Sequence, residues 1–239
     1  MTVRHTAALV LALALAMVAA ACGDDPQREP DGLVAHYPLD GDAVDAVGQS
    51  SGVVSGATRV AGRRGDEGGA LRFDGADDLV TFAHTDGLSL LADFTIAVWV
   101  DIDTPDDLDE FWTLFEKSDP ERDGHSRYGL WLQGGRPWAC FEAADNSQQP
   151  CVEADMSIGE GWHHVAAVRS GRRAIVYVDG VEVANAFVGL GEISQTEFDA
   201  FIGSDGYQRD PSWLTGAVDD LRIYDRGLSA DEVADLASD

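Results

Sequence analysis

The segment from Gly161 to Ala184 restricts the fold of this 239-residue chain more than any other, because it holds two long strand patterns with only tight turns between them. Residues 162–169 are largely apolar at both odd and even positions, and residues 174–178 form a β-branched and aromatic run. Such runs are typical of strands that are buried on both faces. Asp179-Gly180 then supplies the two positive-φ positions of a type I′ turn. The segment therefore predicts a hairpin in the middle of a β-sandwich.

The rest of the chain repeats short strand patterns that are separated by turn-forming residues. We expect further strands at residues 33–37, 53–54, 71–73, 79–82, 94–100, 111–116, 128–132, 138–142, 181–183, 198–202 and 217–224. Only the C-terminus has a helical pattern, in which Ser229 and Glu232 form a capping box and Val233 and Leu236 share one face. Many short strands and one terminal helix predict an all-β sandwich and not an α/β enzyme.

Four groups of residues stand in an order that is characteristic of one known family. They are Trp162-His163-His164-Val165-Ala166 with Val176-Tyr177-Val178-Asp179-Gly180, then Ala70-Leu71-Arg72-Phe73-Asp74-Gly75, Phe94-Thr95-Ile96-Ala97-Val98-Trp99-Val100, and Gly216-Ala217-Val218-Asp219-Asp220-Leu221-Arg222-Ile223-Tyr224 with Leu228-Ser229. Over roughly residues 33–236 the chain resembles the laminin-G-like domains of the concanavalin A-like lectin/glucanase superfamily. The resemblance implies a two-sheet antiparallel jelly-roll sandwich with a short C-terminal helix.

The first 21 residues have the features of an export signal. Arg4 and His5 precede an uncharged, Ala- and Leu-rich run that is too short to span a bilayer comfortably. Cys22 follows three alanines, an arrangement that resembles a bacterial lipobox, in which the cysteine becomes acylated. The alternative is ordinary secretion with cleavage near Ala21. Because two or more acyl chains anchor a protein stably, the lipobox predicts a lipoprotein.

The chain is accordingly divided into three parts. Residues 1–21 are the predicted signal peptide, residues 22–31 are a lipidated N-terminus with a flexible, proline-containing tether, and residues 32–239 are a single laminin-G-like domain. Gly23 is not the aspartate that retains lipoproteins at the inner membrane. We therefore expect an exported protein of the cell envelope, anchored in the outer membrane where the cell has one.

The chain is strongly acidic, with 43 Asp and Glu against 16 Lys and Arg and a formal net charge of −27. The acids are spread along the sequence, which is typical of a solvated exterior. Such a surface repels nucleic acid and anionic lipid headgroups. We therefore expect no nucleic-acid partner, and contact with the membrane only through the N-terminal lipid.

Two cysteines remain once Cys22 carries lipid. Cys140 and Cys151 enclose ten residues, and an exported chain lies in an oxidising compartment. This favours a disulfide over two free thiols or a metal site. Closing so short a loop contributes about 3 kcal/mol in the chain-entropy model.

Several acidic residues lie in motifs that the resemblance associates with a metal. Laminin-G-like domains often hold a structural or ligand-bridging calcium ion, and acidic positions of their motifs are matched here by Asp74 and Asp219-Asp220. Asp77 and Asp78 lie close enough in sequence to Asp74 to supply further oxygen atoms, and calcium requires six to eight oxygen ligands. The alternative is that Asp74 caps a turn and that Asp219 or Asp220 pairs with Arg222 or with a nearby backbone amide.

A glycoside hydrolase is the rival function within the same superfamily. Related glucanases place two carboxylates on one strand in a Glu-x-Asp-x-Glu-like order, about 5 to 5.5 Å apart. The nearest match here is Glu197-Phe198-Asp199, and the last carboxylate is missing because Phe201 occupies its position. His163 and His164 are adjacent on a strand and face opposite ways, so we expect one between the sheets and the other at the surface. No catalytic residue is predicted.

Sugar recognition requires aromatic rings that are exposed at loop ends. The candidates are Trp131, Trp138, Tyr207 and Trp213. Trp99 and Trp162 lie in apolar strands and are expected in the core. The sequence thus predicts a lipid-anchored, non-catalytic, lectin-like module that binds a glycan or a protein at the cell envelope. A structural envelope protein without a small ligand and a glycoside hydrolase are the alternatives.

Overall fold

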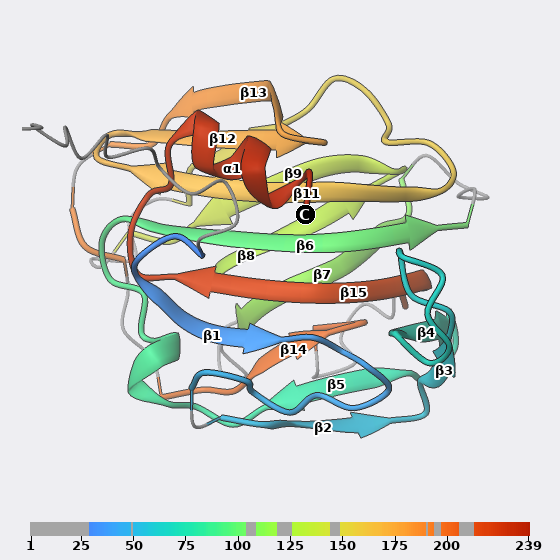
Figure 1. Cartoon of the computed structure of the whole chain (residues 1–239). Helices are drawn as coiled ribbons and strands as arrows, with labels where there is room; N and C mark the ends of the chain where they lie inside the picture. Colours follow the sequence, from blue (N-terminus) through green and yellow to red (C-terminus); the bar gives the residue numbers. More distant parts are fainter. Residues whose placement is uncertain are drawn as a thin grey trace, which may run out of the picture.

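The protein is a sandwich of two antiparallel β-sheets with one short helix (Figure 1). The computed structural model describes residues 29–48, 50–103, 109–118, 126–143, 149–189, 191–193, 197–205 and 213–239. The predicted all-β architecture is confirmed. The predicted signal peptide, Cys22 and most of the tether lie outside the described residues, as does Tyr207.

The first sheet, sheet A, contains eight strands. Their spatial order is β13 (Val181–Phe187), β12 (Arg173–Val178), β11 (Trp162–Ser170), β6 (Phe94–Ile102), β15 (Thr215–Tyr224), β4 (Ala70–Asp74) and β3 (Thr58–Val60), and β1 (Leu33–Tyr37) also pairs with β15. The predicted hairpin segment forms one side of this sheet, and β6 lies at its middle. The strand β11 of this segment pairs with one edge of β6, and the C-terminal strand β15 pairs with the other edge. The sheet therefore continues beyond β6, and residues 161–184 lie to one side of its middle.

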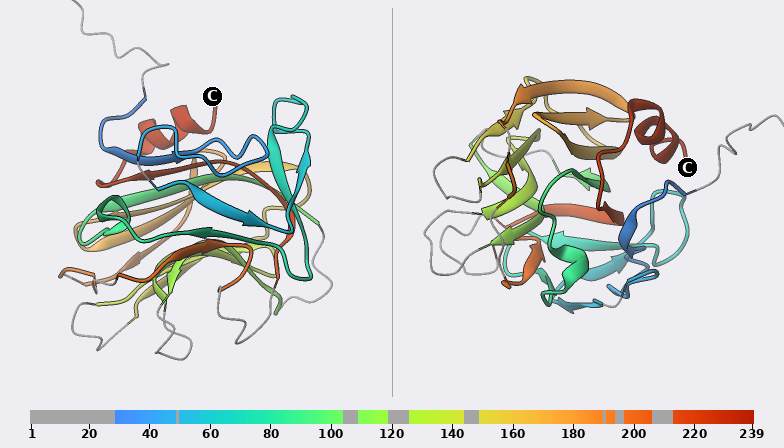
Figure 2. Two further views of the ribbon diagram at one scale, coloured as in Figure 1. Left: turned by 90° about the horizontal axis from the view of Figure 1, so that it is seen from below. Right: turned by 90° about the vertical axis from the view of Figure 1, so that its left-hand side faces the viewer.

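The second sheet, sheet B, contains seven strands. Their order is β10 (Cys151–Glu153), β9 (Arg136–Phe141), β8 (Ser126–Gln133), β7 (Phe111–Ser118), β14 (Ala200–Ile202), β5 (Leu79–Phe82) and β2 (Gly52–Ser55). A short 3-10 helix, η1 (Asp86–Leu88), precedes β6. Figure 2 shows the two sheets as stacked layers, with the helix α1 (Ala230–Leu236) on the outer side of sheet A.

The main core fills the space between the sheets. Successive side chains of a strand point to opposite faces, and alternate residues of β6, from Phe94 to Ile102, enter this core. Large aromatic side chains from both sheets meet there, for example Tyr37 and Phe82 with ring centroids 4.3 Å apart. Apolar burial of this kind is the main stabilising contribution to such a fold.

A second apolar cluster lies on the outer face of sheet A, under α1. Val233 and Leu236 of α1 pack there with Ala166 and Val168 of β11, so β11 is buried on both faces as predicted. The predicted capping box is present, because the Ser229 side chain accepts from the Glu232 backbone amide and the Glu232 side chain accepts in return. The described helices include none long and apolar enough to cross a bilayer.

The turn predicted between β12 and β13 has the expected backbone. Asp179 and Gly180 have φ angles of 50° and 76°, which a type I′ turn requires at both central positions. A Cβ at Gly180 would also lie 2.8 Å from the Cα of Ala234 in α1. Glycine therefore serves two purposes here, since it permits the turn and the close approach of the helix.

Two tryptophans expected in the core lie elsewhere. Trp99 and Trp162 are half-buried, and their strand positions place them on the outer face of sheet A. The guanidinium of Arg63 covers the Trp99 ring at 4.7 Å from its centroid. Strand hydrophobicity did not reveal this arrangement, because both faces of these strands carry apolar residues.

Candidate functional site

The predicted sugar-binding aromatics fall into different environments. Trp131 is only 3 % exposed, so its predicted exposure is wrong. The ring lies over Gly129, where a Cβ would come 2.5 Å from it, and its indole N–H donates to the Glu116 carboxylate. Gly129 therefore allows a tryptophan to lie flat and buried on the outer face of sheet B.

Trp138 is half-buried on the same face and next to Trp131 in the strand register. Its ring packs edge-on against Phe111, with centroids 5.1 Å apart. The indole N–H of Trp138 is shielded from solvent and has no hydrogen-bond partner within the described structure. Trp138 is therefore a partly open aromatic ring with an unused donor.

Polar side chains surround this aromatic pair. The register of β7 to β10 places Gln133 and Arg136 beside Phe111, and Glu153 beside Trp138. Arg136 Nη2 lies 3.2 Å from Glu153 Oε1. We call this set, Phe111, Gln133, Arg136, Trp138 and Glu153, the sheet-B patch. An apolar ring with polar neighbours is the usual composition of a small-molecule site.

The predicted disulfide is adjacent to the patch. Cys140 and Cys151 are directly opposite each other on β9 and β10 and form a disulfide, with Cα atoms 4.1 Å apart. Glu153 is two residues from Cys151, so the bond holds one edge of the patch in register.

Trp213 is half-buried in the segment just before β15. The neighbouring Leu214 donates its amide to Gly203, and its carbonyl accepts from Gly75. No contact joins Trp213 to Trp138 in the described residues. Of these two predicted aromatics, Trp138 thus lies in the sheet-B patch and Trp213 lies outside it.

The acidic residues predicted for calcium separate into two places. Asp74, Asp77 and Asp78 bring one carboxylate oxygen each within 4.8 Å of the others. Asp78 accepts from the Asp74 amide at 2.8 Å, and Asp74 accepts from the Ala76 amide at 2.9 Å. Burial raises the pKa of Asp78, and the charges of Asp74 and Asp77 add to this. A cluster of hard oxygen atoms fits calcium.

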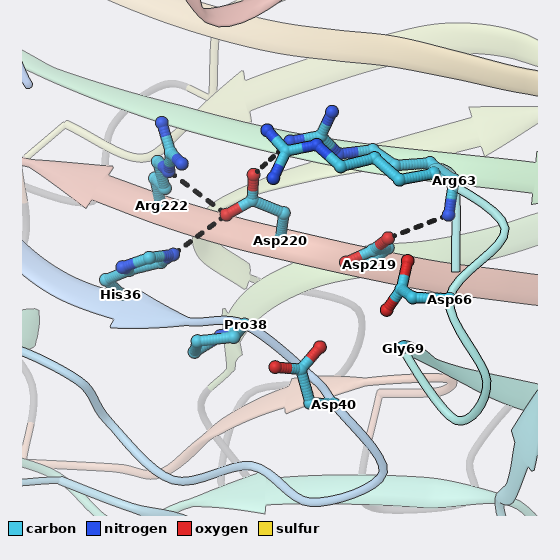
Figure 3. Close-up of a pocket in the computed structure, with 10 residues that line it drawn as sticks. His36, Pro38, Asp40, Arg63, Asp66, Gly69, Asp219, Asp220 and Arg222 are labelled. Carbon is cyan, nitrogen blue, oxygen red and sulfur yellow. Dashed lines mark hydrogen bonds and ion pairs between the residues drawn. The ribbon is translucent and has the colours of Figure 1, made fainter. Parts of the chain in front are cut away.

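Asp219 and Asp220 do not join this cluster, so the expected ion shared with Asp74 is wrong. The strand β15 pairs Thr215 with Asp74, which leaves Asp219 four residues further along the strand. Asp219 and Asp220 instead line a polar cavity of about 160 Å³ between β1, β15 and the loop at residues 61–69 (Figure 3).

Asp220 is the centre of an ion-pair network at this cavity. Its Oδ1 accepts from His36 Nε2 at 2.8 Å and from Arg222 Nε at 3.0 Å, and its Oδ2 accepts from Arg63 Nη2 at 2.9 Å (Figure 3). Burial opposes ionisation, but the hydrogen bond from His36 and the charge of Arg222 outweigh it and hold the pKa of Asp220 well below its usual range. The predicted alternative, pairing with Arg222, is therefore confirmed for Asp220.

Asp219 has a different environment. It is 7 % exposed and accepts from the Arg63 backbone amide at 3.0 Å. Burial raises the pKa of Asp219 to about 6, and the charges of Asp220 and Asp66 contribute to the rise. Asp40 and Asp66 also line the cavity. Four carboxylates thus line the cavity, and a cation there would favour the charged form of Asp219.

The Glu-x-Asp pair considered for hydrolysis is not on a strand. Glu197 and Asp199 precede β14, which begins at Ala200. Asp199 Oδ1 accepts from the His84 amide at 3.1 Å. The alternation that would direct both carboxylates into one cleft is therefore not present at these residues.

The two adjacent histidines face opposite ways, as predicted. His163 Nδ1 lies 2.8 Å from the Asp179 carboxylate and is partly exposed. His164 is 2 % exposed and packs against Trp99 with centroids 5.4 Å apart, and burial lowers its pKa to about 4. The buried histidine lies on the outer face of sheet A, so its expected position between the sheets is wrong.

The sequence analysis did not identify several residues of the sheet-B patch and of the cavity around Asp220. Phe111 begins a predicted strand and was not distinguished from core residues, and Arg63 and His36 lie far in sequence from Asp220. The polar character of His36 and Arg63 was a signal that they could belong to a site, because His36 interrupts an apolar strand and Arg63 lies in a glycine-rich loop. Pairing of β1 with β15 brings His36 to Asp220, and pairing of β4 with β15 brings the loop that carries Arg63 to the same place.

Comparison with known proteins gives a consistent result for the fold. Residues 74–234 match the family described as the concanavalin A-like lectin/glucanases superfamily. No curated protein matches the chain.

Solved structures with the same fold include binding domains. The binding domain of Paraclostridial Mosquitocidal Protein 1 has a TM-score of 0.70 at 16 % identity, covering 87 % of this chain and 52 % of that one. Domain 4 of AbnA, a GH43 extracellular arabinanase from Geobacillus stearothermophilus, was solved in complex with arabinotriose. It has a TM-score of 0.64 at 22 % identity, covering 86 % of this chain and 98 % of that one. The ligand binding domain of botulinum neurotoxin serotype D, in complex with N-acetylneuraminic acid, has a TM-score of 0.67 at 13 % identity, covering 87 % of this chain and 51 % of that one. The chain spans about half the length of the toxin domains.

Proposed function

This chain belongs to the concanavalin A-like lectin/glucanase superfamily, and from this premise we propose that it is a non-catalytic, lectin-like module that binds a glycan through the sheet-B patch. The observation that carries the proposal is the half-buried Trp138, which packs on Phe111 and is flanked by Arg136 and Glu153. Sugar rings present apolar C–H faces and polar edges, and this patch offers the complementary surfaces.

The similar structures support this proposal at the level of ligand class. Two of them were determined with a sugar bound, namely arabinotriose in the arabinanase domain and N-acetylneuraminic acid in the toxin domain. Their identities to this chain are low, so they support a binding role and do not identify the sugar. A non-catalytic role is further supported by Glu197 and Asp199, which lie off the strand that would direct them into a cleft.

The proposal is tested by glycan-array binding followed by titration calorimetry. Trp138→Ala should weaken binding about tenfold or more, because one stacking contact and its buried area are lost. Val53→Ala is a matched control, since Val53 is exposed on β2 at the other edge of the same sheet. Trp131→Ala is not suitable, because Trp131 is buried. Unchanged binding in Trp138→Ala would contradict the proposed site.

A structural envelope protein without a small ligand is the alternative. It would give no binding on glycan arrays, whereas the proposed module must give at least one positive glycan. The presence of a protein partner would be seen by pull-down with the exported protein, and Trp138→Ala decides whether the same patch is involved.

We also propose that the domain binds calcium. Two places offer oxygen ligands: the cluster of Asp74, Asp77 and Asp78, and the cavity lined by Asp219 and Asp66. A bound cation would relieve the repulsion among these carboxylates and stabilise the folded state. The ion would act structurally, by holding the β4–β5 turn or the β1–β15 junction.

A further inference from the structure

We propose that the sheet-B patch selects neutral glycans and discriminates against acidic ones. This inference rests on the proposed function and specifies its ligand class. It follows from the pairing of charges on the outer face of sheet B. Acidic and neutral sugars differ little in shape, so the distribution of charge decides between them.

Among the described residues, each arginine on this face has a carboxylate partner. Arg136 Nη2 lies 3.2 Å from Glu153 Oε1, and Arg127 pairs with Glu142 where both side chains are buried. Arginine is the usual partner of a ligand carboxylate or sulfate, because its planar group binds two oxygens at once. The described strands of sheet B contribute no other cationic side chain to this face. An acidic sugar would therefore compete with Glu153 for Arg136.

Carboxylates also outnumber arginines among the described side chains of this face. Glu116 is buried beside Trp131 and accepts its indole N–H, and it adds a third acid to Glu142 and Glu153. An acidic sugar stacked on Trp138 would lie next to Glu153, since Glu153 is paired with Trp138 in the register of β9 and β10. Like charges at such a separation repel each other, and the repulsion is only partly screened because the separation is well below the Debye length.

A neutral sugar avoids this conflict. A hydroxyl group can donate to Glu153 and accept from Arg136 at the same time, so the ion pair stays intact while the ligand binds. The sugar ring can lie on the half-buried ring of Trp138. Gln133 adds an amide that both donates and accepts. The patch therefore suits hydroxyl groups better than carboxylates.

The test compares neutral oligosaccharides with their uronic-acid or sialylated counterparts on one array, and then by titration calorimetry. The wild-type chain should bind the neutral member of a pair about tenfold or more tightly than the acidic one. Glu153→Gln should raise affinity for the acidic member, because Arg136 loses its competing partner. Glu67→Gln removes the same charge from an exposed loop between β3 and β4 and should leave the ratio unchanged.

Two results would overturn the inference alone. One is a wild-type chain that binds acidic members as tightly as neutral ones, and the other is a preference that Glu153→Gln leaves unchanged. Absence of binding to every glycan would instead overturn the proposed function, and the inference with it. The preference should also shrink when NaCl is raised from 0.15 M to about 1 M, because the Debye length falls to roughly 3 Å.

Discussion

Lys117 is the only lysine of the chain, and the fold buries it to 1 % exposure on β7. Its ammonium group lies 2.8 Å from His84 Nδ1 and donates to the Leu88 carbonyl at 3.0 Å. Burial lowers the pKa of Lys117 to about 8, although the charge of Asp199 opposes the shift. The folded state therefore binds the proton less tightly than the unfolded chain does.

The first prediction concerns the pH dependence that follows. Between pH 8 and 10.5 the unfolded state carries more protons at this residue, so the free energy of unfolding must rise with pH there. From pH 7 to 9.5 the expected rise is about 2 kcal/mol from this lysine. Lys117→Met should remove this rise and stabilise the protein at pH 7 by about 1 to 3 kcal/mol.

Urea unfolding of the wild type and of Lys117→Met at pH 7 and at pH 9.5 measures this change in the free energy of unfolding. The Leu88 carbonyl keeps the Tyr128 hydroxyl as a donor at 2.6 Å in the variant. His84 loses the ammonium as a partner, but its side chain is only half-buried. Tyrosines of the unfolded chain are about a quarter ionised at pH 9.5, and because this affects wild type and variant alike, the difference between the two proteins reports on Lys117. Parallel changes in both proteins between the two pH values would show that Lys117 does not titrate as stated.

At the scale of elements, the shortest strand of the patch depends on a covalent bond. The strand β10 has three residues and pairs only with β9 in its sheet. The Cys140–Cys151 disulfide joins the two strands at the start of β10. We predict that Cys140→Ala/Cys151→Ala lowers the free energy of unfolding by about 3 kcal/mol.

The same variant should also loosen β10 locally. Amide hydrogen exchange at residues 151–153 should accelerate, while exchange in β6 at the middle of sheet A should change only as much as global stability does. Glycan affinity should fall as well, because Glu153 belongs to the patch. Equal stability and equal protection of β10 in variant and wild type would disprove this role of the bond.

At the scale of the whole molecule, calcium should stabilise the domain selectively. At free calcium 100 times the dissociation constant, the folded state gains roughly 2.7 kcal/mol, which corresponds to a melting shift of about 5 to 10 °C. Magnesium should have a much smaller effect, because it demands a tight octahedral shell and keeps its water. Scanning calorimetry at matched ionic strength measures both.

Two single variants show which of the two candidate sites, the Asp74 cluster or the cavity at Asp219, binds calcium. Asp77→Asn changes an exposed member of the first cluster, and Asp219→Asn changes the buried acid of the cavity. The variant that abolishes the calcium shift identifies the site. A shift that survives both substitutions, or equal shifts with calcium and magnesium, would leave these acids as turn and strand residues.

Attachment to the membrane is the other prediction for the whole molecule. Cys22 should be labelled by a fatty-acid analogue in a bacterial host, and Cys22→Ala should not be labelled. The described chain begins near the outer face of sheet A, where Glu29 pairs with Arg222 at 3.3 Å. Equal labelling of both proteins would favour ordinary secretion.

Local chemistry was sufficient to predict most of the elements. Alternation and β-branched runs identified most strands, Asp179-Gly180 identified a turn, and Ser229 with Glu232 identified the start of α1. These features depend on interactions between residues close in sequence, so no tertiary information is needed. The Cys140–Cys151 pair was also predictable, because these are the only two cysteines outside the predicted lipobox.

The candidate sites depended on contacts that only the tertiary structure creates. A strand pattern tells which residues share a face, but not whether a second layer covers that face. Trp131 is buried while Trp138 is half-open, although both lie on the outer face of sheet B. Similarly, Asp220 is hydrogen-bonded to His36 and Arg63, which are 184 and 157 residues away in sequence. Sequence periodicity thus determined the strands, whereas pairing between distant strands decided which side chains became available for binding.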